Sequence, residues 1–233
     1  LLSGQMSNEI TDVSTSQLYN PTQNQWASDL IKRFDLPQKM FGTLTPAGTS
    51  LGSLRGSIQQ ETGLAASTQV VLPGTHDTAS AVVAVPVNQS PTSAPDWCYI
   101  SSGTWSLMGV EVSRPIINDL TAHHNFTNEA GVGGTTRLLK NIAGLWLIQE
   151  CRRIWERAGR VYTWEQMAEM ARGVAPCQFL INPDDPALNA PADMPQMIRD
   201  LARRDSAGRS GAVPETDAQI LRCAFDSLAK RYS

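Results

Sequence analysis

Residues 69–85 read QVVLPGTHDTASAVVAV, and this stretch decides the fold. Its first part, Val70 to Leu72, predicts a short buried strand, and the Pro-Gly pair that follows predicts a turn. Gly74 lets backbone or ligand approach this turn closely. The run of small residues from Thr78 onward predicts a helix. The stretch is therefore expected to fold as a strand, a turn and a helix.

Asp77 stands where the predicted helix begins. The helix dipole stabilises an ionised carboxylate at that end, and His76 precedes it directly. A charged carboxylate at the mouth of a strand-turn-helix element can serve as a general base. The alternative interpretation is that Asp77 only caps the helix, and the local pattern taken alone favours this cap.

The composition is that of an ordinary globular protein. Hydrophobic residues make up 41% and charged residues 18% of the 233 positions, so one or two domains with a sizeable core are expected. The net charge of −3 without a basic block makes nucleic acid an unexpected partner. No apolar run approaches the ~20 residues that span a bilayer, so we expect no membrane partner.

The four cysteines, Cys98, Cys151, Cys177 and Cys223, are widely spaced. Their spacing supports neither disulfides nor a zinc site, and a reducing cytoplasm fits best. The chain starts without Met and without a signal peptide, and it ends inside a predicted helix. We therefore expect a fragment of a longer protein.

A proline-rich segment predicts a domain boundary. Residues 86–96, PVNQSPTSAPD, carry three prolines and several small polar residues. We place the boundary there, so that residues 1–90 form one domain and residues 91–233 the next. Within the first domain, apolar spacing predicts a helix over 24–34, and the glycine-rich residues 41–66 predict a loop with at most one strand.

A β-hairpin is predicted directly after the boundary. Residues 97–100 and 105–112 read as its strands, and Ser101–Thr104 as its turn. Backbone N–H groups, a hydroxyl and a flexible glycine in this turn can hold a phosphate, although such a turn is more often a plain hairpin connection. Residues 126–139 predict a third strand with a glycine-rich turn.

From Asn141 onward the apolar residues recur at helical spacing as far as Gly159. Asn141 and Gln149 would then lie two turns apart on one helix face, where polar side chains need backbone or ligand partners. Capping-box patterns predict the starts of three further helices. Their capping residues are Thr163, Asp193 and Thr216.

The remaining polar pairs predict no chemistry. Adjacent histidines on a strand, as expected for His123 and His124, point to opposite faces, and no carboxylate or thiol stands at ligand spacing to them or to His76. We therefore expect no metal held by side chains. Asp184 and Asp185 lie between two prolines, which predicts a turn rather than an acid–base pair.

Three blocks of this sequence, in order and spacing, resemble the FGGY family of carbohydrate kinases. They are HDTASAV at 76–82, SSGTWSLMG at 101–109 and LLKNIAGLWLIQE at 138–150. NEITDVSTSQLYNPTQNQW at the start and RCAFDSLAKRY near the end resemble the family as well. The spelling of these blocks is most similar to that of the family members that act on L-rhamnulose.

The resemblance implies an α/β protein of the actin-like (ribonuclease-H-like) ATPase fold, with two domains that are each incomplete in this chain and an active site between them. Residues 1–90 would be the end of the sugar-binding domain and 91–233 the first part of the nucleotide-binding domain. Asp77 would be the general base. The resemblance also assigns sugar contacts to His76, Thr78 and Asn141, and nucleotide contacts to Gly103, Thr104 and Gln149.

The implied activity is ATP- and Mg²⁺-dependent phosphorylation of L-rhamnulose at O1, a step of rhamnose catabolism. The family's first phosphate hairpin and its adenosine-binding segment have no counterpart here, so we expect these 233 residues alone to turn over little or no sugar. Two alternatives stay open: a family kinase for another ketose or polyol, such as fuculose or xylulose, and a non-catalytic sugar-binding remnant. The oligomeric state is open too.

Overall fold

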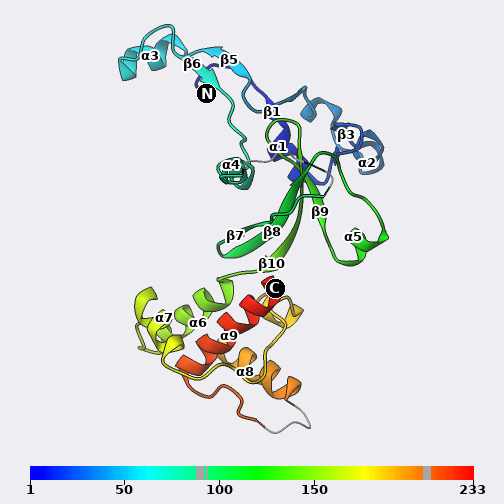
Figure 1. Ribbon diagram of the computed structural model, residues 1–233. Helices are drawn as coiled ribbons and strands as arrows, with labels where there is room; N and C mark the ends of the chain where they lie inside the picture. Colours follow the sequence, from blue (N-terminus) through cyan, green and yellow to red (C-terminus); the bar gives the residue numbers. More distant parts are fainter. Residues whose placement is uncertain (88–91, 93, 207–210) are drawn as a thin grey trace. The chain divides into compact units, whose positions relative to one another are not determined.

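A computed structural model of the protein describes residues 1–87, 92, 94–206 and 211–233 (Figure 1). These residues form two compact units, which we treat separately. The first unit comprises Leu1–Tyr99 with Gly109–Lys140, and the second comprises Ile100–Met108 with Asn141–Ser233. The expected domain boundary between residues 90 and 91 lies outside the described residues.

The first unit opens with short elements, as expected, although a helical turn interrupts them. They are β1 (Asn8–Glu9), α1 (Ile10–Val13), η1 (Ser14–Ser16), β2 (Tyr19–Asn20) and β3 (Gln25–Trp26). Helix α2 (Ser28–Arg33) is shorter than predicted. The reason is that Trp26 pairs with Tyr19 in a hairpin and donates its indole N–H to the Gly42 carbonyl at 2.8 Å.

The glycine-rich segment holds more structure than the single strand expected there. It contains β4 (Leu44–Thr45), which pairs in parallel with β1, then β5 (Ser50–Ser53) and α3 (Gly56–Thr62), after η2 (Gln38–Met40). Helix α3 ends at Gly63, whose φ of 71° is the left-handed C-cap that glycine adopts without strain. With seven residues, this helix is too short to show a helical period in the sequence.

The strand-turn-helix prediction for the organising stretch is confirmed by β6 (Gln69–Val71) and α4 (Asp77–Val83). The strand is not buried, however: Val71 is 53% exposed because β5 and β6 form a sheet of only two strands. His76 is the N-cap residue of α4, with an extended backbone, and Asp77 is the first helical residue. The interpretation of Asp77 as the N-cap is therefore wrong.

A larger sheet has the strand order β7-β8-β10-β9. Strand β7 (Tyr99–Ser102) runs two residues into the expected turn, and β8 (Trp105–Val112) is as predicted. The third strand is in fact an antiparallel hairpin of β9 (Thr127–Ala130) and β10 (Thr136–Ala143) around the glycine-rich turn. His123 lies on an unexpected short helix, α5 (Asp119–His123), and not on a strand.

Strand β10 continues to Ala143, and α6 (Trp146–Arg157) starts later than predicted. Asn141 is therefore an exposed strand residue, and the prediction that it shares a helix face with Gln149 is wrong. The cause is Gly144. A Cβ at this position would lie 2.5 Å from the Gly103 oxygen and 2.8 Å from the Thr104 oxygen, so the chain turns here against another backbone segment.

Within the described residues, four α-helices build the core of the second unit (Figure 1). After α6 come α7 (Trp164–Arg172), η3 (Pro186–Leu188), α8 (Met194–Asp205) and α9 (Asp217–Tyr232). The three predicted starts are confirmed, because Thr163, Asp193 and Thr216 each accept a hydrogen bond from the backbone three residues on. Buried side chains of all four helices, such as Trp155, Met167, Ile198 and Leu221, form one apolar core.

The remaining expectations concern turns, thiols and surface. The Asp185 backbone N–H donates to the Asn182 carbonyl at 3.0 Å, so the predicted turn at Asp184–Asp185 is confirmed. All four cysteines carry free thiols.

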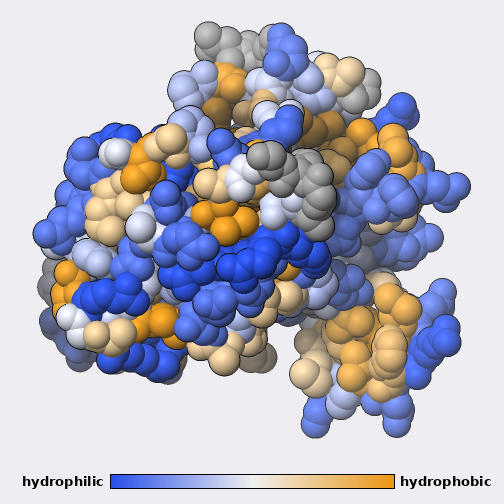
Figure 2. Space-filling view, turned by 90° about the horizontal axis from the view of Figure 1, so that it is seen from below, coloured by the Kyte–Doolittle hydropathy of each residue, from blue (hydrophilic) through white to orange (hydrophobic). Residues whose placement is uncertain are grey.

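On the face that Figure 2 shows, hydrophobic residues form separate groups among hydrophilic ones. None of the helices in the described ranges combines the length and the hydropathy that crossing a membrane requires.

Candidate active site

The Asp77 carboxylate projects into solvent at the first turn of α4. Its side chain is 96% exposed. Oδ1 accepts hydrogen bonds from the Thr78 backbone N–H at 2.6 Å and from the Thr78 hydroxyl at 3.2 Å. Within the described part of the chain, no group donates to Oδ2. One oxygen of Asp77 is thus held by the protein, and the other is presented outward.

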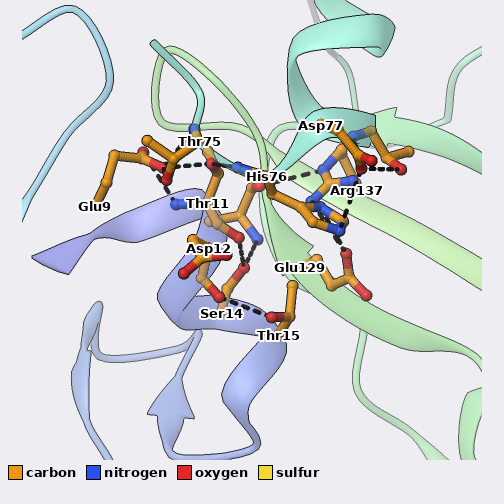
Figure 3. Close-up of polar contacts among 12 residues, drawn as sticks. Glu9, Thr11, Asp12, Ser14, Thr15, Thr75, His76, Asp77, Glu129 and Arg137 are labelled. Atoms are coloured by element: carbon orange, nitrogen blue, oxygen red, sulfur yellow. Dashed lines mark hydrogen bonds and ion pairs between the residues drawn. The ribbon is translucent and has the colours of Figure 1, made fainter. Parts of the chain in front are cut away.

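The His76 imidazole lies beside this carboxylate. Its Nε2 edge is near Asp77, and its Nδ1 edge faces the interior. Its Nε2 is 3.9 Å from Asp77 Oδ1, which is too far for a hydrogen bond. Its Nδ1 lies 2.9 Å from Nη2 of Arg137 (Figure 3). The imidazole is therefore anchored on the interior side and presents its second nitrogen next to Asp77.

Arg137 and Glu129 form a buried ion pair beneath His76. They are cross-strand partners of β10 and β9, and Nη2 of Arg137 lies 3.0 Å from Oε2 of Glu129. The Arg137 side chain is only 1% exposed, and its Nε also donates to the Ala130 carbonyl at 3.2 Å. Removing one partner of such a pair leaves an uncompensated buried charge, which is strongly destabilising. The pair is therefore a rigid support for His76.

Glu9 holds the loop on the other side of His76. This buried carboxylate accepts hydrogen bonds from the Thr75 backbone N–H at 2.9 Å and from the Thr75 hydroxyl at 2.8 Å. It also accepts from the backbone and the hydroxyl of Thr11 (Figure 3). Burial raises the pKa of Glu9, but these hydrogen bonds outweigh it, and the net pKa lies below the usual value. Glu9 is thus an ionised anchor for the loop.

A separate group of predicted site residues lies in the second unit. The turn between β7 and β8 accepts hydrogen bonds from the first N–H groups of α6: Leu145 donates to the Gly103 carbonyl at 2.8 Å and Trp146 to the Thr104 carbonyl at 3.0 Å. The Gln149 side-chain amide donates to the Thr104 hydroxyl at 3.1 Å. Sequence-distant residues Gly103, Thr104 and Gln149 are therefore brought together.

One backbone N–H of the turn that we predicted could bind phosphate already has a partner within the turn. The Gly103 N–H donates to the Trp105 carbonyl at 3.1 Å, while the Thr104 side chain stays exposed. Asn141 is exposed on β10, in the second unit as well. The predicted site residues thus fall into two groups, with His76, Asp77 and Thr78 in the first unit and the other four in the second.

Sequence reasoning missed the residues that support His76 and Asp77, namely Glu9, Glu129 and Arg137. A signal for two of them is present in the strand pattern, because Glu129 and Arg137 carry opposite charges on the two sides of a glycine-rich turn. Their spacing across a glycine-rich turn is that of a hairpin pair. Glu9 has no comparable local signal, since its partner Thr75 lies 66 residues away.

The described ranges contain no group of three or more histidine, cysteine, aspartate or glutamate side chains placed to hold a metal ion. We therefore assign no residue of this chain as a ligand of a resident metal.

Two family profiles match the chain. The profile of the FGGY family of carbohydrate kinases, N-terminal domain, matches residues 1–84, and that of the C-terminal domain matches residues 98–233. Among curated proteins, a rhamnulokinase of Bacteroides thetaiotaomicron is 43% identical over 232 residues, and one of Bacillus subtilis is 38% identical over 233 residues. Each alignment covers all of this chain but 45% of the relative, so the chain spans about half the length of these proteins.

Solved structures of sugar kinases have the same fold. A gluconate kinase from Lactobacillus acidophilus superposes with a TM-score of 0.67 at 15% identity, over 99% of this chain and 44% of that one. At this identity the likeness concerns the fold alone. The expected α/β fold of the actin-like ATPase class is thereby confirmed.

Proposed function

The chain belongs to the FGGY family of carbohydrate kinases, and on this basis we propose that the protein carrying it transfers the γ-phosphoryl group of ATP to O1 of L-rhamnulose. The substrate assignment rests on the similarity to rhamnulokinases along all of the chain. Because the chain spans 45% of those relatives, the activity is proposed for the complete kinase and not for these 233 residues alone.

The exposed and anchored carboxylate of Asp77 is the observation that carries the proposal. As the sugar oxygen attacks phosphorus, its proton must leave, and Oδ2 is free to accept it. Thr78 holds Oδ1, so the carboxylate keeps one orientation while it does so. A positioned general base typically contributes ~10²–10⁴-fold to the rate.

The second unit would contribute to the nucleotide side. Phosphoryl transfer requires mainly positioning and the neutralisation of spread negative charge. ATP enters as its Mg²⁺ complex, which is the second substrate and supplies positive charge. In this proposal the exposed Thr104 hydroxyl contacts a phosphate, Gly103 allows close approach, and Gln149 orients Thr104. Asn141 contributes a further sugar contact.

The domain division is part of the same proposal. Residues 1–90 would be the end of the sugar-binding domain and residues 91–233 the first part of the nucleotide-binding domain. The two family profiles, which end at residue 84 and begin at residue 98, support a boundary in this interval.

The decisive variant is Asp77→Asn in the complete kinase, which keeps the size of the side chain and removes the base. We expect kcat to fall by ~10²–10⁴-fold while the affinity for L-rhamnulose changes little. Asp29→Asn, at another exposed aspartate in the first turn of a helix, is the matched control and should leave kcat unchanged. Unchanged kcat in Asp77→Asn would exclude Asp77 as the base, whereas a folded complete protein that binds L-rhamnulose without turning it over would favour the non-catalytic sugar-binding alternative.

A substrate panel tests the choice of sugar. L-rhamnulose, fuculose and xylulose are compared by kcat/KM at saturating ATP. The proposal requires L-rhamnulose to have the highest value. Equal or faster turnover of fuculose or xylulose would show instead that the protein is a kinase of the same family for that other ketose.

A further inference from the structure

We propose that Arg137 and Glu129 are positioning residues that keep the ring proton of His76 on Nε2. His76 then presents an N–H donor next to the Asp77 carboxylate. The assignment of the ring proton rests on the geometry of the first unit alone. The use of this donor for a sugar hydroxyl rests on the proposed function.

The ring proton follows from the donor capacity of arginine. A guanidinium carries five N–H donors and no acceptor, and it stays protonated in proteins. Nη2 of Arg137 lies 2.9 Å from Nδ1 of His76. The contact is a hydrogen bond only if Nδ1 offers its lone pair, and a neutral imidazole that accepts at Nδ1 carries its proton on Nε2.

Glu129 decides whether Arg137 stays in that position. Its Oε2 binds the same Nη2 at 3.0 Å, while it lies 3.7 Å from Nδ1 of His76, beyond hydrogen-bond distance. The bond from Arg137 Nε to the Ala130 carbonyl fixes the guanidinium from a second side. Without Arg137, the nearest charged group to Nδ1 would be the Glu129 carboxylate, which favours a proton on Nδ1.

The consequence at the surface is a matched donor and acceptor. Nε2–H of His76 and Oδ1 of Asp77 are 3.9 Å apart, so a hydroxyl oxygen can lie within hydrogen-bond distance of both groups. Such a hydroxyl accepts from His76 and gives its own proton toward Asp77. With the proton on Nδ1 instead, Nε2 and Asp77 would both be acceptors, and the hydroxyl would lose one of the two bonds.

The ring proton can be measured directly in this chain, which contains three histidines. ¹⁵N-histidine labelling and long-range ¹H–¹⁵N correlation spectra distinguish a protonated ring nitrogen from an unprotonated one, and the His76→Gln variant identifies the His76 signals. We expect a protonated Nε2 and an unprotonated Nδ1. A proton on Nδ1 in the unmodified protein overturns the proposal, whatever the activity of the kinase.

Two variants test the support by Arg137. Arg137→Met should move the ring proton to Nδ1, toward Glu129, whereas Arg137→Lys keeps a cationic donor and should keep the proton on Nε2. Arg160→Met, which removes an arginine paired with Asp217 in the second unit, is the control and should leave the His76 signals unchanged. A folded Arg137→Met variant with wild-type His76 signals contradicts the proposal. If that variant does not fold, the position of the ring proton in Arg137→Lys and in the unmodified protein still tests the proposal. A proton on Nδ1 in either of them contradicts it.

The sugar contact is tested separately in the complete kinase. The amide nitrogen of His76→Gln reaches about as far as Nε2 and keeps the donor, whereas the shorter His76→Asn does not. We expect the KM for L-rhamnulose to rise about tenfold in His76→Asn and much less in His76→Gln, as for the loss of one hydrogen bond. Equal KM values in an active kinase overturn the sugar contact. An unmodified kinase without activity overturns the proposed function instead, and the ring-proton assignment still stands.

Discussion

Thr78 donates two hydrogen bonds to one oxygen of Asp77, from its backbone N–H at 2.6 Å and from its hydroxyl at 3.2 Å. Thr78 is only 7% exposed. Its hydroxyl is therefore committed to the neighbouring carboxylate. In this structure Thr78 orients Asp77, and we infer that the sugar contact proposed for it acts at least partly through that carboxylate.

Substituting Thr78 should separate this orienting role from packing. Thr78→Val keeps the branched shape and removes the hydroxyl, and Thr78→Ser keeps the hydroxyl. In the complete kinase we expect kcat to fall roughly 3- to 10-fold in the Val variant, as for the loss of one hydrogen bond to a carboxylate, and to change less in the Ser variant. A larger loss in Thr78→Ser than in Thr78→Val would show that the methyl group matters instead.

Gln149 should act on the nucleotide and not on the sugar. Its amide donates to the Thr104 hydroxyl, so Gln149→Ala frees that side chain to rotate. We expect the KM for ATP to rise roughly 3- to 10-fold with the KM for L-rhamnulose unchanged. Gln60→Ala, on exposed α3, serves as the control. A change confined to the sugar KM would contradict the assignment of Gln149 to the nucleotide side.

Gly144 should tolerate no side chain. An added Cβ would lie 2.5 Å, 2.8 Å and 2.9 Å from backbone atoms of Gly103, Thr104 and Ser106. Overpacking of this kind typically costs about 1–3 kcal/mol. Urea unfolding of Gly144→Ala should show a loss in this range. Gly56→Ala, where a Cβ would meet nothing within 4 Å, should leave the free energy of unfolding unchanged or slightly raised.

Cys177 should be a reactive thiol near neutral pH. The hydrogen bond with Cys223 favours its thiolate and outweighs burial, so the pKa of Cys177 is lowered to about 7. Alkylation by iodoacetamide, followed by peptide mass spectrometry, should accelerate as the pH rises through about 7 and level off above it. Burial raises the pKa of Cys151, which should stay unmodified in the folded protein. Cys223→Ala, which removes the donor, should move the Cys177 midpoint upward.

Glu9 should make the stability of the first unit sensitive to acid. Its pKa is lower in the folded protein than its ordinary value of 4.5, so folding favours the ionised carboxylate. This stabilisation is fully present above about pH 4.5 and is lost as the pH falls through the folded-state pKa. Between pH 5 and pH 3, Tm should therefore fall more in the unmodified protein than in Glu9→Gln. Glu61→Gln, on exposed α3, should behave like the unmodified protein.

The parts of the fold that local chemistry specifies were predictable. The starts of α7, α8 and α9 were found because a capping side chain and its backbone donor are three residues apart in the sequence. Strand β8 and helix α4 were found for a similar reason, since their patterns end at clear turn residues. The start of α6 was missed because residues 141–143 fit a strand as well as a helix, and only contact with a distant turn decides between them.

The candidate site was predictable to a different degree. The local pattern alone offered Asp77 as a candidate base and the turn ending at Thr104 as a candidate phosphate site. Family resemblance then assigned roles to these residues and to His76, Thr78, Gly103, Asn141 and Gln149. Arg137 and Glu129 could have been recognised as a cross-strand pair only once the register of β9 and β10 was known. The bond between Glu9 and Thr75 could not have been found, because nothing local to either residue encodes a contact between them.

That last contact also has a kinetic meaning. Bringing Glu9 and Thr75 together closes a loop of more than sixty residues, an entropic cost that no local propensity offsets. The Thr75 N–H can therefore be paired with Glu9 only in molecules in which the beginning of the chain has docked. The time at which the Thr75 amide hydrogen becomes protected from solvent exchange during refolding then reports when this region assembles.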